Sequence, residues 1–492
     1  MRPLNCRKGW HHHNDPSHDA EALSSLASLF GFQYPQHSLN QAWQKLLVNQ
    51  DHGIVSGVSI EEVHADSARD YQELFAIGSE VLHGAIRSLA AKIDTTGEGE
   101  AVVVFNTLSW PRNGLVRIRL DANREEYYIQ DRQGKKLPCQ IIELENGERE
   151  LLFLARDVPP LGYATFRLVK GKASAASSSL KISKSSLENQ FLSIQLDSEG
   201  NIVSLFDKKA QREVVPQGER ANELQTFEDI HPDQHWDWDM DLSYQDRPLE
   251  LFRTEEVHPV RCLLSNRVKT VETGPVRAAM KVTRKSQNSV IRQRILIYHD
   301  IPRIDFETEI DWHEKEVLLK AAFPVEVHSS QATYEIQFGN IQRPTHWNTS
   351  WDKAKFEVWA HRWADLSEGN YGVSLLNDSK YGYDIKENTM RLTLLRTTKK
   401  HPFEDVVRYT DQGRHKFVYS LYPHTGGWRE GRTLQQACEL NLPLRGVIES
   451  AHPGDLPPQY SFVHTRSDNL IVETLKKAEE GGGLILRVWE AY

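Results

Sequence analysis

The hydrophobic residues of this chain follow a helical period up to about residue 100 and a strand period after it. In the first part, Leu23 and Leu26 fall on one helical face, and a second amphipathic pattern has Asn40 as its candidate N-cap. A longer apolar stripe runs from 71 to 93, over roughly six turns of helix. Three helices joined by short turns predict a small bundle at 20–95.

Strand-like alternation dominates the rest of the chain. Residues 101–105 are β-branched or aromatic except for one alanine, and 191–206 predict a hairpin that turns near Gly200. The predicted fold class is α+β by content and mostly β, a short three-helix bundle followed by antiparallel β-sandwich domains. The predicted parts are a disordered start at 1–19, the bundle at 20–95, a small β domain at 97–170, a Ser-rich linker at 171–186, a large sandwich at 187–432 and a C-terminal β domain at 433–492.

Composition and charge argue against several classes of protein. The formal net charge of −9 argues against a nucleic-acid partner, because phosphate binding favours a basic face. No apolar run is long enough to cross a membrane, and the first 19 residues lack the apolar core of a signal peptide. The four cysteines lie far apart without disulfide or zinc spacing, so we expect a reducing, cytoplasmic compartment.

Common catalytic motifs are incomplete in this sequence. His313 and Glu314 begin a zinc-protease pattern, but the second histidine is missing. Ser56 lies one position late for a nucleophile elbow. A Gly-rich phosphate loop ending in Lys-Ser or Lys-Thr is also absent. Standard motifs therefore assign no reaction.

Carboxylates and aromatic residues alternate around residue 237. In an extended strand, Asp237 and Asp239 would face one side and Trp236 the other. Carboxylates beside indole rings suit sugar hydroxyls or a cation, but a solvated strand edge with inward aromatic residues explains the same pattern. A calcium loop is excluded, because Pro248 stands where its bidentate Glu belongs. Trp428, in a turn rich in glycine, is another candidate for sugar binding, with core packing as its alternative.

One histidine, His52, lies in the turn between the second and third predicted helices, next to Gly53. A zinc site needs three or four ligands, and sequence spacing supplies only this one. Taken alone, His52 is therefore better explained by helix capping or packing than by metal binding.

Several segments of the sequence follow one another in the order seen in one known family. They lie at 43–71, 105–110, 191–208, 224–229, 302–384 and 422–441. With them, the chain from about residue 20 to its end resembles the C-terminal half of the α-mannosidases of glycoside hydrolase family 38. The number of separate motifs in the right order makes this resemblance specific.

The resemblance implies a galactose-mutarotase-like fold for the large sandwich and retaining hydrolysis of α-mannosides. In that reaction one carboxylate attacks the anomeric carbon and another protonates the leaving oxygen. The family also binds zinc, and His52 matches its zinc-binding histidine. That histidine is usually followed by Asp, whereas here Gly53 follows and Asp51 precedes it. Asp51 is therefore a candidate for substrate binding only if the turn is rearranged.

The resemblance does not include the N-terminal α/β module, which carries the nucleophile, the acid/base and the other zinc ligands in the family. We therefore assign no catalytic residue within the chain, and expect an incomplete zinc site, no activity of the chain alone, and exposed apolar surface on the bundle. The expected partners are an α-mannoside oligosaccharide and a separate catalytic α/β chain, with a homo-oligomer left open. The alternatives are a carbohydrate-binding or scaffold protein and an inactive fragment.

Overall fold

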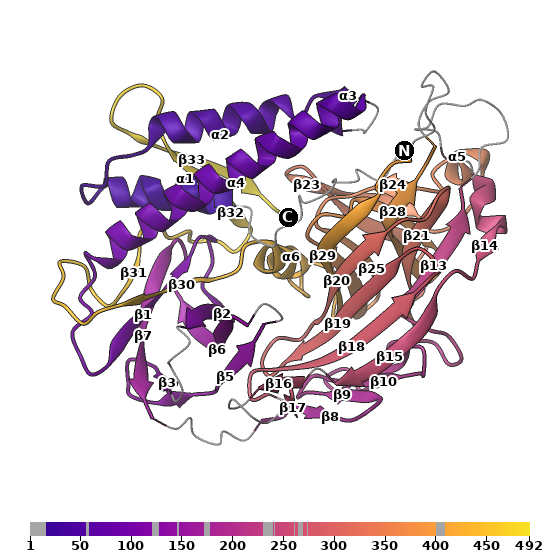
Figure 1. The fold of residues 1–492 in the computed structure, drawn as a ribbon, viewed down its shortest axis with the longest axis horizontal. Coiled ribbons are helices and arrows are strands. Elements are labelled where there is room, and N and C mark those ends of the chain that lie inside the picture. The colour runs from indigo at the N-terminus through magenta and orange to yellow at the C-terminus, as the bar shows by residue number, and fades with distance from the viewer. Residues whose placement is uncertain are drawn as a thin grey trace.

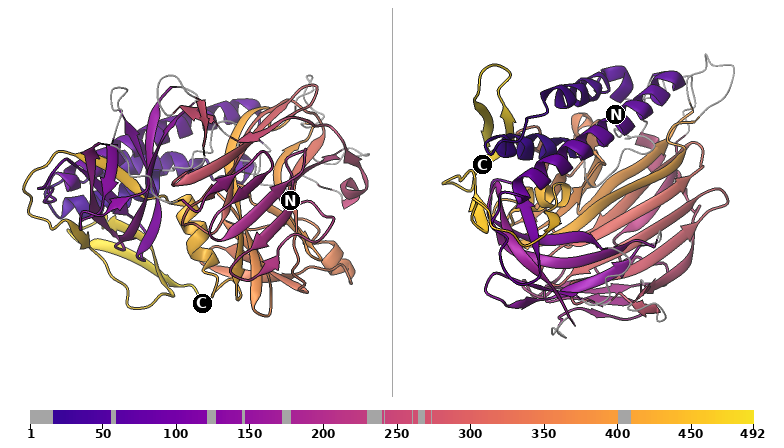
Figure 2. Two further views of the ribbon diagram at one scale, coloured as in Figure 1. Left: turned by 90° about the horizontal axis from the view of Figure 1, so that it is seen from below. Right: turned by 60° about the vertical axis from the view of Figure 1, so that its left-hand side comes forward.

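The computed structural model contains a helical bundle, a small β domain and a large β-sandwich (Figure 1). The left view of Figure 2 shows the small β domain and the sandwich side by side, and the right view shows the bundle lying across them. The structure describes residues 16–55, 59–120, 127–144, 147–171, 178–229, 240, 242–259, 261–263, 269–272, 274–399 and 409–492.

Three long helices and one short helix form the bundle, in agreement with the predicted three-helix pattern. The last long helix buries the predicted stripe, including Leu74, Val81 and Leu89. The predicted N-cap, Asn40, lies inside the second helix, whose N-cap residue is Pro35. In the described part of the chain, none of the helices is long and apolar enough to cross a membrane. The helices are α1 (Pro16–Ser28), α2 (Gln36–Val48), α3 (His52–Val55) and α4 (Glu61–Ala90).

The first helix begins earlier than the predicted disordered start allows. Asp19 is fully buried and accepts hydrogen bonds from the Thr107 hydroxyl and from Nε of Arg445, each at 2.7 Å. These contacts hold α1 against the small β domain, so the ordered chain includes residues that the sequence assigned to a tail. Residues 1–15 lie outside the described part.

The small β domain consists of two antiparallel sheets around one hydrophobic core. One sheet has the order β30-β1-β7-β3-β4, with β31 also paired to β7, and the other has the order β2-β6-β5. Val104, Val116, Phe153 and Phe166 pack in the core between them. The strands are β1 (Glu100–Asn106), β2 (Arg112–Leu120), β3 (Tyr127–Gln130), β4 (Lys136–Leu137), β5 (Cys139–Glu143), β6 (Arg149–Val158) and β7 (Gly162–Lys170).

The last part of the chain completes this domain, whereas the sequence predicted a separate C-terminal domain. β30 (Arg445–Glu449) pairs with β1, and β31 (Gln459–Ser461) pairs with β7. The reason lies in β1, which is buried from its second residue to its last and therefore needs a neighbour on each edge. A terminal hairpin of β32 (Leu470–Lys477) and β33 (Leu484–Glu490) packs against α1, where the carbonyl of Glu473 lies 3.0 Å from Nε2 of His18.

The large sandwich has a nine-stranded and a six-stranded antiparallel sheet that share one core. Their orders are β15-β18-β19-β20-β29-β26-β25-β22-β23 and β14-β13-β21-β28-β27-β24. The core includes Phe306, Trp312, Phe323 and Tyr419, all essentially without solvent exposure. The strands are β13 (Glu223–Glu228), β14 (Pro248–Leu249), β15 (Arg253–Pro259), β18 (Arg277–Lys285), β19 (Val290–Tyr298), β20 (Ile304–Trp312), β21 (Val317–Pro324), β22 (Gln331–Ile336), β23 (Gly339–Pro344), β24 (Val358–Trp359), β25 (Trp363–Glu368), β26 (Tyr371–Asn377), β27 (Gly382–Lys386), β28 (Thr389–Thr397) and β29 (Gly413–Thr425).

A five-stranded sheet at the entry to the sandwich contains the predicted hairpin. Its first strand lies inside the predicted linker, because Ile182 packs against the sandwich core. Its order is β12 (Arg212–Glu213), β11 (Ile202–Asp207), β10 (Leu192–Leu196), β9 (Ser186–Glu188) and β8 (Lys181–Ile182). The remaining elements are β16 (Arg261–Leu263), β17 (Lys269–Val271), α5 (Ser350–Lys353), α6 (Thr433–Asn441) and the 3₁₀ turn η1 (Leu242–Asp246).

A buried ionic cluster lies on the six-stranded sheet of the sandwich. Lys320 has no solvent exposure, and its ammonium contacts Glu357 and, at 2.5 Å, Asp384. Asp384 also accepts a hydrogen bond from Arg391 at 2.9 Å, and Thr393 donates to Glu357 at 2.5 Å. Every carboxylate here is paired, which is the condition for placing charges in a protein interior.

Candidate functional site

The turn that carries His52 is held by contacts between the end of α2 and α4. At the end of α2, the Asn49 amide donates to the carbonyl of Lys45 at 2.8 Å and to Asp70 at 3.2 Å, and the Lys45 ammonium lies 2.8 Å from Asp70. Asp51 then starts α3, because its carboxylate accepts the backbone N–H of Gly53 at 2.8 Å. The hydrogen bonds that hold the turn therefore involve Asn49, Asp51 and Gly53, on both sides of His52.

The His52 side chain points entirely into solvent, with a relative exposure of 100%. Its nearest carboxylate is Asp51, whose Oδ2 lies 3.6 Å from Nδ1. Within the described residues, no three histidine, cysteine or acidic side chains form a group that could hold a metal ion. One histidine with one neighbouring carboxylate does not meet the three or four ligands that zinc requires. The described part of the chain therefore offers at most part of a zinc site.

Exposed apolar side chains precede and follow His52 in the chain at the end of the bundle that carries α3, and we call this end the bundle tip. Leu47 and Val48 at the end of α2 are each 61% exposed, Val55 of α3 is 42% exposed, and Ile60 before α4 is 58% exposed. Figure 1 shows α3 at the end of the bundle remote from β1 and β30. Large apolar side chains clustered on a surface mark a site of contact with another surface. The expectation of exposed apolar surface on the bundle is therefore confirmed.

The other candidate residues are placed apart from His52 or are not described. Trp236, Asp237 and Asp239 lie outside the described residues, so their role in sugar binding stays a prediction. Trp428 packs against Trp363, with ring centres 5.2 Å apart, and against Tyr492 at 5.9 Å. Trp428 is partly buried against a hydrophobic cluster under α6. It therefore packs against the core and also keeps some solvent exposure.

A Ser–His–Asp arrangement under α6 has the wrong geometry for nucleophilic catalysis. Nε2 of His424 lies 3.0 Å from the Ser374 hydroxyl and 2.8 Å from the Asp365 carboxylate. A catalytic triad uses the two ring nitrogens separately, one for the acid and one for the hydroxyl. All three side chains are buried, so this cluster is a structural hydrogen-bond network.

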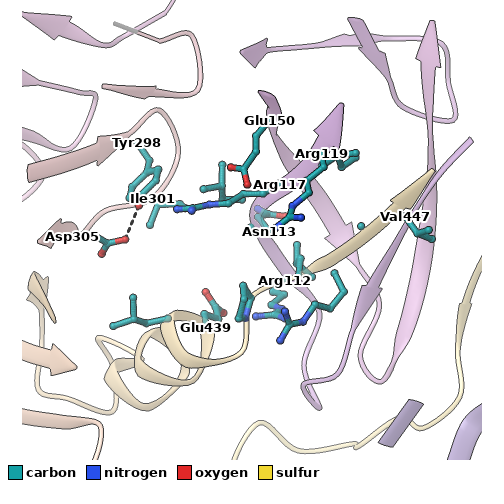
Figure 3. Close-up of a pocket in the computed structure, with 18 of the residues that line it drawn as sticks. Arg112, Asn113, Arg117, Arg119, Glu150, Tyr298, Ile301, Asp305, Glu439 and Val447 are labelled. Atoms are coloured by element: carbon teal, nitrogen blue, oxygen red, sulfur yellow. Dashed lines mark hydrogen bonds between the residues drawn. The ribbon is translucent and has the colours of Figure 1, made fainter. Parts of the chain in front are cut away.

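A cavity of about 640 Å³ lies where α4, β2, β20 and the segment from α6 to β30 meet. Figure 3 shows Tyr298 and Asp305 on one side, Glu439 and Arg112 on another, and Arg117 pointing into the space between them. Nothing in the sequence motifs predicted this site, because its walls come from segments far apart in the chain.

Most charged groups of the cavity are paired. Arg303 donates to Asp305 at 2.8 Å, and Arg117 donates to Glu307 at 3.0 Å. The Tyr298 hydroxyl donates to Asp305 at 2.7 Å, and burial raises the pKa of Tyr298 well above its usual value, so it remains a donor. Arg112, Arg87, Glu150 and Glu439 also line the cavity, and none of the four forms an ion pair with another described residue.

One sequence signal could have found Arg112. In β2, alternation places Arg112 on the same side of the strand as Val116, Ile118 and Leu120, which are buried. An arginine at an inward position requires either a partner or a cavity.

Two family descriptions match the chain. The glycosyl hydrolases family 38 C-terminal domain matches residues 187–404, and the alpha mannosidase middle domain matches residues 11–89. Human alpha-mannosidase 2C1 is 33% identical over 491 residues, which cover 96% of this chain and 42% of that protein. Alpha-mannosidase G of Dictyostelium discoideum is 32% identical over 510 residues, covering 96% and 45%. The chain thus spans less than half the length of these curated relatives.

Solved structures show the same fold. The crystal structure of a family 38 glycosyl hydrolase from Enterococcus faecalis superposes with a TM-score of 0.79 at 18% identity, covering 97% of this chain and 63% of that one. An α-mannosidase from Enterococcus faecalis V583 gives a TM-score of 0.78 at 18% identity, covering 97% and 61%. The order of bundle, small β domain and sandwich therefore follows that architecture. The chain carries the middle and C-terminal domains of the family 38 α-mannosidases.

Proposed function

We propose that this chain is the non-catalytic part of an α-mannosidase, and that its bundle tip completes an active site whose carboxylates belong to an α/β module. The observation that carries this proposal is a fully exposed histidine in a turn held by hydrogen bonds, with exposed Leu47, Val48, Val55 and Ile60 close to it in the chain. Among the described residues, Asp51 is the partner of the His52 side chain, and an exposed histidine near exposed apolar side chains suits a contact between modules.

In this proposal His52 supplies one ligand to a zinc ion, and the other ligands come from the α/β module. Bound zinc would orient and polarise sugar hydroxyls. The chain's own contribution is to hold the imidazole in place, through the turn that Asp51 caps and that Asn49 ties to α4. Because Asp51 uses one carboxylate oxygen for that cap, it would contact a substrate hydroxyl only if the turn is rearranged.

The proposed substrate is an α-mannoside oligosaccharide, and the proposed setting is mannoside breakdown in the cytoplasm. The two family matches and the α-mannosidase relatives support this substrate class. The chain alone would lack the two carboxylates that retaining hydrolysis requires, so we propose that it has no activity by itself.

The test is hydrolysis of an aryl α-mannoside by the purified chain, with and without zinc, and again with an added α/β module of a family 38 enzyme. We expect activity only in the presence of the module. This activity should be lost when the His52→Ala variant is used in place of the native chain. A matched control is His83→Ala, since His83 is also an exposed bundle histidine but lies on α4 at the cavity. Activity of the chain alone that depends on His52 would show that the carboxylates lie within these residues, against the proposal. No activity under any condition would favour a carbohydrate-binding or scaffold role.

A further inference from the structure

The interdomain cavity is separate from the bundle tip. It contacts α4 at Leu82, His83, Ile86 and Arg87, in the second half of that helix. His52 precedes the start of α4 at Glu61, so the helix rise of 1.5 Å per residue puts roughly 30 Å between the two places. A ligand in the cavity would therefore not touch the surface assigned to catalysis.

Arg112 is a buried cation on the cavity wall without a counter-ion in contact. It is 5% exposed, and its side chain donates from Nη1 to the carbonyl of Leu442 at 2.6 Å. Its Nε and Nη2 are buried and have no hydrogen-bond partner within the part of the chain that the structure describes. Among the described residues, none of the carboxylates forms an ion pair with it, unlike Arg303, Arg117 and Arg445. Burial lowers the pKa of Arg112 to about 10, so the group is still charged at neutral pH.

Such a group is costly unless something in the cavity pairs with it. A buried charge without a contacting partner destabilises the folded state, and the carboxylates of Glu439 and Asp19 act on Arg112 only at a distance, without a hydrogen bond to it. A guanidinium with two free N–H directions matches two oxygens of a phosphate or carboxylate, in the fork geometry that makes arginine the usual oxyanion ligand. The cavity volume of about 640 Å³ falls within the range of small-molecule sites.

The charges of the lining favour an anion only modestly. Six arginines and four carboxylates line the cavity, and three of those carboxylates are Glu150, Asp305 and Glu307. The fourth, Glu439, faces the same space as Arg112 and accepts hydrogen bonds from Trp110 at 3.0 Å and Gln436 at 3.2 Å. Neither of its contacts is a cation, so Glu439 would oppose an anion bound at Arg112.

We propose that the cavity binds a small ligand through a phosphate group held by Arg112, with the rest of the ligand against the apolar wall of Leu82, Ile86 and Leu444. Free phosphate and a sugar phosphate share this chemistry. The ligand would link the helical bundle, the small β domain and the sandwich, because each of them supplies part of the wall.

The test is calorimetric titration of the whole chain with inorganic phosphate, with glucose 6-phosphate, and with free glucose as the uncharged control, at constant ionic strength. Thermal unfolding with the same ligands gives a second readout, since a ligand that binds only the folded state raises Tm. Arg112→Gln removes the proposed ligand, and Arg112→Lys keeps the charge without the fork. Glu439→Gln removes the opposing charge while keeping the side-chain size, and Arg119→Gln is the matched control, because Arg119 lines the same cavity with a side chain that is 78% exposed.

The proposal requires that phosphate or glucose 6-phosphate binds, and that glucose does not. Arg112→Gln should weaken binding by about ten-fold or more, Arg112→Lys should lie between, and Arg119→Gln should be unchanged. Glu439→Gln should tighten binding by several-fold. Tighter binding of glucose 6-phosphate than of phosphate identifies a sugar phosphate as the ligand, and equal binding identifies the free anion.

Three results would overturn the proposal. One is no binding of either anion to the native chain, which would mean that water fills the cavity. Another is binding that survives Arg112→Gln in a folded variant. If Arg112→Gln does not fold, unchanged affinity in Glu439→Gln decides against the site. None of these readouts uses mannoside hydrolysis, so they stand apart from the proposed function.

Discussion

Replacing Lys320 by methionine should destabilise the sandwich strongly at neutral pH. The side chain has no solvent exposure, and its ammonium serves two carboxylates, of which Glu357 is 2% exposed and Asp384 is 4% exposed. Methionine fills a similar volume but carries no charge. Among the described residues, the cation that then remains in contact with these two carboxylates is Arg391, which lies 2.9 Å from Asp384. Removing one partner of a buried ion pair costs about 3–5 kcal/mol.

The pH dependence of this loss is a sharper test than its size. In the native cluster, burial raises the pKa of Asp384, but Lys320 and Arg391 outweigh that effect and hold the pKa below its usual value. A depressed pKa stabilises the folded protein above the unfolded-state pKa of about 4, and this contribution is lost as pH falls through the folded pKa. Without Lys320, only Arg391 opposes the effect of burial on the pKa of Asp384, so the folded variant takes up a proton there more easily than the native protein does. The destabilisation should therefore shrink as pH falls from about 7 to about 5.

Urea unfolding followed by tryptophan fluorescence measures both effects. With a slope of about 3 kcal/mol per molar urea, the loss lowers the midpoint by about 1 M or more at neutral pH. Lys320→Met with Glu357→Gln should recover much of it, because the remaining Asp384–Arg391 pair is balanced. Lys45→Met is the matched control, since Lys45 also contacts two carboxylates but lies at the surface. A native midpoint for Lys320→Met, or a loss that does not change with pH, would refute the reasoning.

Three further predictions concern packing, thiol chemistry and the bundle tip. Gly162→Ala should lower Tm, because an added Cβ would lie 2.1 Å from the carbonyl oxygen of Tyr460 in the β7–β31 pair, whereas Gly482→Ala meets no atom within 4 Å and should be neutral. Burial raises the pKa of the Cys438 thiol to about 12, so a variant that keeps only this cysteine should react with a thiol reagent at pH 8 after unfolding and not before; rapid reaction of the folded protein would contradict its burial. Leu47→Glu should leave Tm unchanged, because Leu47 is 61% exposed, but should weaken binding of an α/β module in a pull-down or titration; unchanged binding would exclude this surface as the contact.

Sequence patterns predicted those parts of the fold that depend on local periodicity. The apolar stripe of α4 and the β10–β11 hairpin both follow the expected pattern, because period alone decides which face is buried. The return of β30 to the edge of β1 was not predictable, since strand pairing between residues more than 300 apart leaves no local signal. For the same reason the sequence assigned a separate C-terminal domain.

The sequence identified candidate site residues only in the turn that carries His52, and not in the interdomain cavity. His52 was identified because resemblance to a family drew attention to one histidine; the structure shows that its side chain is exposed, and its role as a zinc ligand stays a prediction. Arg112 was missed, because its meaning depends on which walls the fold brings around it. A buried cation is a property of tertiary packing, and only its inward position in β2 was visible in the sequence.

Metal analysis of the assembled protein tests whether His52 is a zinc ligand. The chain is mixed with an α/β module of a family 38 enzyme, the complex is isolated by gel filtration, and its zinc content is measured beside that of the two separate parts. We expect tightly held zinc in the complex and little zinc in the isolated chain. The zinc content should fall strongly in the complex made with His52→Ala, but not in the complex made with His83→Ala. A complex of His52→Ala that forms normally and holds as much zinc as the native complex would contradict the role assigned to the bundle tip.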